Sequence, residues 1–464
     1  MLLTSNLMFL VYSTLSNSML MNRLGTMTMM FTFMTYMNSM SMVSLTPGMT
    51  MFNNWFKLTT YNLPLTYLMF GMMMMLLLYN TTNVKYNLKS NFYMLLMMSN
   101  MMGLMLLPLV NDLLTLYMMM ELQSYSLYLL TGLHNKSYNA SRASLLYFMM
   151  GGMASVMILM GSYYMYNMTG TTNLTDMSLL NDMMNTNNNN NYMNLSMKDY
   201  FDMMVMALLF KMGLAPLHRW SMSVYNYAPT YMTAYMSMVA KMSMGCWLYV
   251  NSNLFNNYMF MMFFYVSLLM GSYKPLYQMN MKTMLAYSGM LNFGYVLLTM
   301  MTYDMSFYVY MMQYVLTHMM LFMGMLSASE YMEKPMTKWS PLLYMHQLRL
   351  PNLTLSFMLM LALFSLMGMP PLPGFYAKLY VLTGAMQDNY MLETCLMMVC
   401  SVLATYYYSN MMKMLMTSKN DNKMLEVNNI NSTNAYMLSM CLMLLLTFFM
   451  YLPYLLEGLY IMMM

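Results

Sequence analysis

Hydrophobic residues in this chain form long continuous runs. Runs such as 65–78, 93–110, 255–270 and 438–456 are separated by shorter polar stretches. A membrane-spanning helix needs roughly 20 apolar residues, whereas the strands of a membrane barrel alternate apolar and polar positions. Lipid-exposed spans must be helices or closed barrels, because the bilayer satisfies no backbone hydrogen bonds. The continuous runs therefore predict an all-α polytopic membrane protein.

The run lengths predict about 14 transmembrane helices. In chain order, the predicted spans are 3–19, 26–46, 63–80, 92–110, 112–132, 143–166, 202–217, 230–250, 255–272, 283–301, 305–327, 353–382, 389–412 and 434–456. The first run carries no charge and no small-residue cleavage site, so we interpret it as a span and not as a signal peptide. Between the sixth and seventh spans lies an Asn-rich tract without periodicity, which predicts an extramembrane, partly disordered loop over 167–200.

Composition excludes a soluble protein. Charged residues make up 7% of the chain, against about 25% in ordinary soluble domains. Methionine occurs 89 times, while isoleucine occurs only at Ile158, Ile430 and Ile461. Packing does not explain this excess of methionine over isoleucine, because both residues fill apolar cores in similar ways. An AT-rich mitochondrial genome that reads AUA as methionine explains it. A Met-rich copper- or partner-binding surface is the alternative, but the methionines are spread over all the spans.

Several functional classes lack their signatures in this sequence. There is no Gly-rich phosphate loop and no nucleophile elbow. The net charge of +5 is scattered, without the basic stripe that nucleic acid requires. The cysteines form no C-x-x-C pair, which favours core packing over a disulfide or metal framework; they are Cys246, Cys395, Cys400 and Cys441.

The four histidines are too few and too scattered for the paired ligands of a heme-binding subunit. His134 and His346 fall in predicted loops. His218 lies just beyond a predicted helix break and His318 lies in mid-span, where each could relay a proton. Ordinary packing is the alternative for both.

Few charged side chains fall inside the predicted spans. The candidates among them are Glu121, Lys211, Lys241, Lys378 and, at the start of a span, Lys282. Charges at mid-bilayer cost several kcal/mol, so they usually face the bundle interior and mark ion or proton paths. Lysine suits proton transfer because desolvation lowers its pKa and a nearby carboxylate raises it, whereas arginine stays protonated. We expect these charges to handle protons; snorkelling or a static ion pair is the alternative for any one lysine.

Two of these lysines stand beside predicted helix breaks. Lys211 is followed by Gly213 and Pro216, which weaken or kink a helix. Lys378 follows the proline-rich stretch 370–374. Carbonyls freed at such a break are partners for an ammonium group, as in the broken helices of transporters.

Four segments resemble a known family: "MELQSYSLYLL" (120–130), "FKMGLAPLHRW" (210–220), "KTMLAYSGMLNFGYVLL" (282–298) and "GMPPLPGFYAKLYVL" (368–382). Their order and spacing are similar to those of the mitochondrial NADH dehydrogenase subunit 2 family over residues of about 90 to 385. These are antiporter-like, proton-translocating membrane subunits of respiratory complex I. The composition indicates a fungal mitochondrion.

The resemblance implies two inverted five-helix repeats, each with one broken helix, the seventh and the twelfth. We accordingly divide the chain into N-terminal helices (1–90), a first antiporter-like half with the Asn-rich loop (91–250), a second half (251–412) and a loop with a C-terminal helix (413–464).

The resemblance also implies roles for single residues. Glu121 is similar to the family's fifth-span glutamate, and Lys211 to the lysine of its broken seventh helix. Lys241 is similar to the central eighth-span lysine. Lys378 is similar to the lysine of the broken twelfth helix, where the related subunit 4 is expected to carry glutamate. Lys282 resembles a basic residue that opens the "AYS" segment.

One position departs from the family's pattern, because Asn292 stands where many relatives place histidine. The role of His318 stays open, since related subunits vary at that position.

Glu121 and Lys211 are hypothesised to form a switchable ion pair, from which protons pass through Lys241 toward Lys378.

The implied function is coupling of NADH:ubiquinone electron transfer, performed by other subunits, to proton movement through this chain. The resemblance places the chain in the mitochondrial inner membrane. It implies contacts with other membrane and accessory subunits of complex I, including neighbouring antiporter-like subunits, and with lipids such as cardiolipin, but not with nucleic acid. No cofactor is expected in this chain; NADH, FMN, iron–sulfur clusters and ubiquinone are expected on partner subunits. A stand-alone cation/proton antiporter of the same fold is the alternative function, and a purely structural scaffold is a third.

Overall fold

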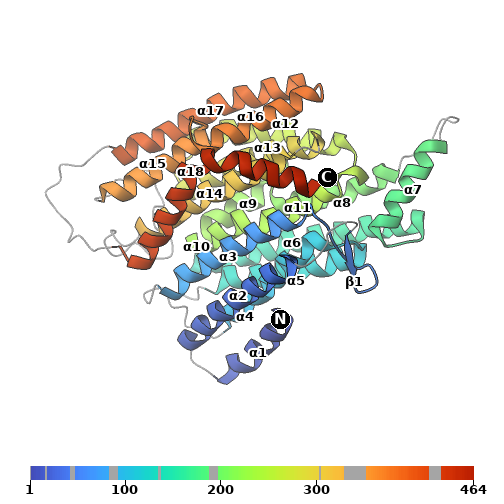
Figure 1. Ribbon diagram of the computed structural model, residues 1–464, viewed down its shortest axis with the longest axis horizontal. Coiled ribbons are helices and arrows are strands. Elements are labelled where there is room, and N and C mark those ends of the chain that lie inside the picture. Colours follow the sequence, from blue (N-terminus) through green and yellow to red (C-terminus); the bar gives the residue numbers. More distant parts are fainter. Residues whose placement is uncertain are drawn as a thin grey trace. The chain divides into compact units, whose positions relative to one another are not determined.

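The computed structural model describes residues 2–15, 18–41, 48–82, 92–133, 137–187, 197–302, 305–328, 352–416 and 430–463, and most of them are helical (Figure 1). The helices before the first break are α1 (Leu2–Leu15), α2 (Ser18–Ser41), α3 (Leu63–Thr82), α4 (Tyr93–Leu106), α5 (Leu113–Gly132), α6 (Tyr138–Thr169), α7 (Leu174–Asn187) and α8 (Met197–Met212). The later helices are α9 (Arg219–Tyr227), α10 (Thr230–Tyr235), α11 (Lys241–Val250), α12 (Asn257–Tyr273), α13 (Met281–Thr302), α14 (Ser306–Ala328), α15 (Leu353–Met367), α16 (Pro373–Gln387), α17 (Met391–Met416) and α18 (Ser432–Met463).

Each predicted span overlaps a helix, so the prediction of an all-α polytopic membrane protein is confirmed. Among the described residues, five helices are long and apolar enough to cross a membrane, namely α6, α13, α14, α17 and α18. Shorter apolar helices run over Leu2–Thr14, Leu63–Tyr79, Tyr93–Leu109 and Leu353–Met367.

Both predicted helix breaks are present. The first separates α8 from α9, and the second separates α15 from α16. Gly213 (φ 72°) and Gly368 (φ 89°) follow the last residues of α8 and α15 in the left-handed conformation that glycine adopts without strain. Each break also contains a cis peptide bond, Ala215–Pro216 in the first and Pro370–Pro371 in the second.

The predicted loop at 167–200 is wrong over part of its length, because α7 occupies Leu174–Asn187. Tertiary contacts hold the start of this helix. The Leu174 amide donates to the Asn111 carbonyl at 2.9 Å, and the side-chain amide of Asn111 donates to Asn173 at 2.7 Å. Met177 is fully buried. Burial of a few apolar residues thus gives a helix where the sequence shows no periodicity.

A short hairpin lies between the second and third predicted spans, where the sequence analysis placed no strand. It consists of β1 (Met49–Met51) and β2 (Phe56–Leu58), paired antiparallel with Met49 opposite Leu58. The buried side chains of Phe56 and Leu58 anchor it.

Two compact units can be distinguished in the chain. The first takes residues from 1–74, 88–220 and 239–263, and the second from 75–87, 221–238 and 264–464. In the first unit, α6 packs against both α5 and α8. In the second, α14 packs against α15, α16 and α18. The domain boundaries at 90, 250 and 412 stay a prediction.

Candidate functional site

Glu121 and Lys211 form an ion pair inside the first unit. Glu121 lies near the middle of α5, and Lys211 is the next-to-last residue of α8. The Lys211 Nζ donates to Glu121 Oε1 at 3.2 Å, and the two side chains are only 5% and 12% exposed. A hydrogen bond between two charged groups is stronger than one between neutral groups. The pair joins a carboxylate and an ammonium group that are 90 residues apart in the sequence.

Glycines bring the helices that carry this pair close together. On α6, a Cβ at Gly161 would lie 3.2 Å from the backbone nitrogen of Met204 on α8. On α4, a Cβ at Gly103 would lie 3.1 Å from the backbone nitrogen of Gln123 on α5. Both distances are shorter than ordinary van der Waals contacts, so larger side chains would push the helices apart. The pair is therefore held by closely packed backbones.

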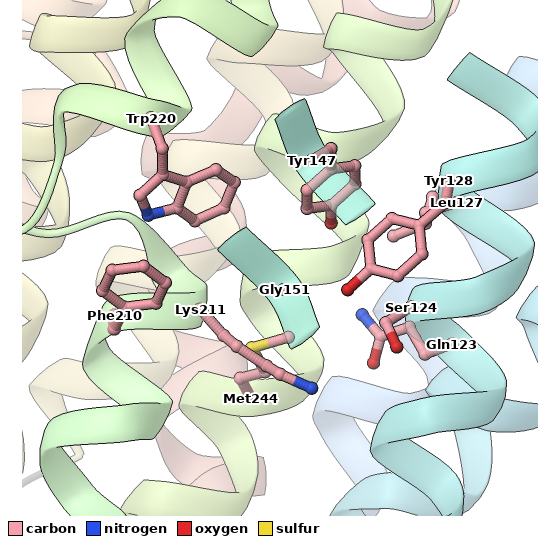
Figure 2. Close-up of a pocket in the computed structure, with 10 residues that line it drawn as sticks. All are labelled: Gln123, Ser124, Leu127, Tyr128, Tyr147, Gly151, Phe210, Lys211, Trp220 and Met244. Carbon is pink, nitrogen blue, oxygen red and sulfur yellow. The ribbon is translucent and has the colours of Figure 1, made fainter. Parts of the chain in front are cut away.

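Lys211 opens onto a small enclosed cavity in the first unit (Figure 2). The centre of a water molecule can occupy about 10 Å³ of this space, which is close to the minimum for one water. Figure 2 shows the Lys211 nitrogen, the Tyr128 hydroxyl and the side-chain ends of Gln123 and Ser124 directed toward the same space. Its lining residues are Gln123, Ser124, Leu127, Tyr128, Tyr147, Gly151, Phe210, Lys211, Trp220 and Met244.

Lys241 is connected to this region through Gln123. It is 4% exposed and is the first residue of α11, directly after a π-helical stretch over Met236–Ala240. Gln123 Nε2 donates to the Ala240 carbonyl at 3.4 Å, and Gln123 Oε1 accepts from the Ser243 hydroxyl at 3.5 Å. Gln123 therefore contacts one residue before Lys241 and one residue after it in the sequence, and it also lines the cavity beside Lys211.

Lys378 belongs to the second unit and is held by a helix end. Its Nζ donates to the carbonyls of Leu366 at 2.9 Å and Met367 at 3.0 Å, the last two residues of α15. Carbonyls at a helix C-terminus have no partner within the helix and carry the negative end of its dipole. The break between α15 and α16 thus supplies the acceptors for this ammonium group.

Lys282 is held in a similar way. It lies at the start of α13, is 3% exposed, and its Nζ donates at 2.7 Å to the carbonyl of Ala228, the residue after α9. In the second unit, the buried Lys282 and the half-buried Lys378 therefore bind carbonyls at the C-terminal ends of helices.

His218 and His318 are buried histidines in different surroundings. The Nδ1 of His218 lies 3.2 Å from the Pro216 carbonyl within the first break. The Nδ1 of His318 lies 3.0 Å from the carbonyl of Tyr314 on its own helix, and its ring packs 4.0 Å from the Tyr314 ring. His134 and His346 lie outside the described residues.

The polar residues around these charges carry no signal in the sequence that marks them as neighbours of Lys211. Gln123 and Tyr128 stand in the "MELQSYSLYLL" segment, but their spacing does not show that they face Lys211. In the second unit, Asn292, which stands where many relatives place histidine, lies among buried tyrosines. Its Oδ1 accepts a hydrogen bond from the Tyr310 hydroxyl at 2.9 Å. The abundance of tyrosine, with 44 residues in the chain, conceals this group in the sequence.

No group of three or more His, Cys, Asp or Glu side chains within the described part of the chain is placed to hold a metal ion. The four cysteines are free thiols, of which Cys246, Cys400 and Cys441 are buried and Cys395 is exposed.

Two broken helices, a buried ion pair and lysines bound at helix ends define an antiporter-like membrane protein. The family model described as NADH:quinone oxidoreductase/Mrp antiporter, transmembrane, matches residues 110–405. The fold is similar to that of a chain of respiratory complex I from Thermus thermophilus, with a TM-score of 0.81 and 21% identity over 99% of both chains.

Two curated relatives are more specific. The chain is 60% identical to NADH-ubiquinone oxidoreductase chain 2 of Debaryomyces hansenii, over 99% of each chain. It is 44% identical to NADH-ubiquinone oxidoreductase chain 2 of Candida albicans, over 88% of this chain and 85% of that one. The chain belongs to the NADH-ubiquinone oxidoreductase chain 2 family, which confirms the family and the antiporter-like fold predicted from the four segments.

Proposed function

We propose that this chain is the proton-translocating membrane subunit of respiratory complex I that its family defines. It couples NADH:ubiquinone electron transfer on other subunits to proton transfer through its own interior. The observation that carries this proposal is the buried Glu121–Lys211 ion pair, placed next to a helix break in a chain of this family.

The ion pair supplies a two-state element for proton transfer. While the pair is closed, the Glu121 carboxylate stabilises the charged form of Lys211. When the pair opens, the ammonium group loses its counter-charge inside the protein, where a charge without one is costly. It then releases its proton to a nearby acceptor and becomes a neutral amine. The pair closes again when Lys211 regains a proton.

The other lysines extend this scheme. Gln123 contacts the backbone next to Lys241 and lines the same cavity as Lys211. Movement of Lys211 therefore changes the surroundings of Lys241 through Gln123. In the second unit, Lys378 is the proposed endpoint for the protons, and Lys282 is a further candidate, both bound to carbonyls at helix ends. His218 and His318 are candidate relays of lower priority.

The setting of the chain follows from its family. Its partners are other subunits of complex I, and neighbouring antiporter-like subunits and lipids such as cardiolipin are proposed among its contacts. We place it in the mitochondrial inner membrane, with NADH, FMN, the iron–sulfur clusters and ubiquinone bound by partner subunits. A stand-alone cation/proton antiporter is not favoured, because the relatives that are 60% and 44% identical to the chain are both chains of NADH-ubiquinone oxidoreductase.

Neutralising Lys211 tests the proposal directly. In the assembled complex, Lys211→Gln should lower proton pumping about tenfold or more, because the ammonium group is lost while an amide still fills the space. The matched control is Lys274→Gln, since Lys274 is exposed outside the spans. Pumping is measured in inner-membrane vesicles that oxidise NADH. Normal pumping by an assembled Lys211→Gln complex would contradict the proposal.

A further inference from the structure

We propose that Tyr128 is a positioning residue for Lys211: with Ser124 and Gln123 it holds one water molecule against the Lys211 ammonium group. This water site stabilises the state in which Lys211 has moved away from Glu121. The inference rests on the proposed function and adds to it a second station for the ammonium group.

The cavity has the size and the lining that a single water needs. Its volume for the centre of a water molecule is about 10 Å³, and a buried water makes about three hydrogen bonds to polar groups. The polar ends of Lys211, Tyr128, Ser124 and Gln123 are directed toward this cavity. Together they offer a water the hydrogen-bond partners that it needs.

The position of the Tyr128 hydroxyl is set by α6. A Cβ on Gly151 would overlap this hydroxyl, so the phenol end lies in a notch that only glycine provides. The Tyr128 ring also meets Tyr147 edge-on, with ring centroids 4.7 Å apart, and Phe148 edge-on at 5.8 Å. These contacts fix both the direction and the depth of the hydroxyl.

Aromatic rings close the opposite side of the cavity. Tyr147 stacks on Trp220 at 5.5 Å, and Phe210 packs against the same indole at 5.7 Å. Phe210 precedes Lys211 in α8, and Trp220 follows the break, so the wall spans the interruption between α8 and α9. The walls thus exclude bulk water and leave the polar corner formed by α5 next to Lys211.

The chemistry of this corner suits an ammonium group that has left its carboxylate. An ammonium group has three donors and no acceptor. Water, the Tyr128 hydroxyl and the Gln123 carbonyl oxygen all accept hydrogen bonds. Water-mediated contacts are nearly as favourable as direct ones. The open state of the ion pair therefore has partners, and its population depends on the Tyr128 hydroxyl.

The test compares substitutions that alter the hydroxyl with one that does not. Tyr128→Phe removes the hydroxyl and keeps the ring. Gly151→Ala keeps the hydroxyl and displaces it. Gly152→Ala is the matched control, because a Cβ at Gly152 meets nothing within 4 Å. Proton pumping and NADH oxidation by the assembled complex are measured in inner-membrane vesicles from pH 6 to pH 9, with assembly followed on native gels and Lys211→Gln as a reference.

Loss of one hydrogen bond that supports a charged group should lower the pumping rate of Tyr128→Phe about tenfold. Its pH profile should shift as well, because the hydroxyl acts through the protonation of Lys211. Gly151→Ala should behave likewise, and Gly152→Ala should match the unchanged protein. If Tyr128→Phe assembles poorly, Ser124→Ala takes its place and should also lower the rate and shift the profile.

The outcomes separate the two proposals. If Lys211→Gln stops pumping while the Tyr128→Phe complex, or the Ser124→Ala complex that replaces it, keeps the normal rate and pH profile, the water site is overturned and the proposed function stands. A lower amount of complex with an unshifted pH profile means that Tyr128 only packs, which also overturns the inference. If Lys211→Gln pumps normally, the proposed function fails and the inference fails with it.

Discussion

The stability of the Glu121–Lys211 pair depends on the balance between the lost hydration of the two charges and their mutual attraction. This balance determines which substitutions the pair tolerates. Both side chains are almost fully buried, and each charge loses its hydration when the helices pack. Their mutual attraction offsets much of that cost only while both are present. Removal of one charge therefore does more harm than removal of both. This asymmetry separates the structural contribution of the pair from its role in proton transfer.

Glu121→Gln should destabilise the assembled complex by about 3 kcal/mol, because it leaves the Lys211 ammonium without its carboxylate in the interior. The double variant Glu121→Gln/Lys211→Gln should recover most of this loss, since no unpaired charge is then left in the interior. Pumping should stay low in both variants. Thermal unfolding of the purified complex measures stability, and a double variant less stable than Glu121→Gln alone would contradict the argument.

At the scale of the element, helix C-terminal ends serve as binding sites for lysine. The carbonyls at the end of α15 bind Lys378, and the carbonyl after α9 binds Lys282. Helix ends supply acceptors and a partial negative charge without adding a carboxylate. A lysine can then stay buried next to groups that do not titrate.

Gly374 makes the second break possible and should not tolerate a side chain. A Cβ at this position would overlap the backbone carbonyl oxygen of Ser365, which cannot move away without disturbing the last turn of α15. Gly374→Ala should therefore lower the amount of assembled complex to below about a third of normal, a loss typical of strained core positions. Gly458→Ala in α18 is the control, because a Cβ there meets nothing within 4 Å. Native gels measure both; equal amounts would show that the break can adjust.

The elements differ in how far sequence could predict them. Span length depends on bilayer thickness, and the breaks depend on local glycine and proline, so both are readable without tertiary contacts. Helix α7 is different, because burial of residues such as Met177 against distant segments stabilises it. The cavity beside Lys211 escaped prediction for the same reason. Its walls come from α5, α6, α8, α9 and α11, and no local pattern shows that Tyr128 and Gly151 meet.

At the scale of the whole molecule, many apolar side chains remain uncovered by the chain itself. In the most apolar stretch of each helix, only 28% of α6 and 33% of α18 is buried, whereas 94% of α13 is buried. Exposed apolar surface of this extent indicates contact with lipid or with other subunits. Because the family belongs to complex I, the other subunits are those of complex I. This surface is where we expect them and the surrounding lipids to lie.

The energy for pumping must then come from outside this chain. Moving one proton against 100 mV costs about 2.3 kcal/mol, and electron transfer on partner subunits provides it. Vesicles that contain the assembled complex should acidify when NADH is oxidised, whereas vesicles with the purified chain alone should form no gradient on addition of NADH. A sodium or potassium gradient should likewise drive no proton movement through the isolated chain. A pH-sensitive dye inside the vesicles measures each case. Cation-driven proton movement by the isolated chain, abolished by Lys211→Gln, would instead establish the stand-alone antiporter, because the same ion pair would then work without electron transfer.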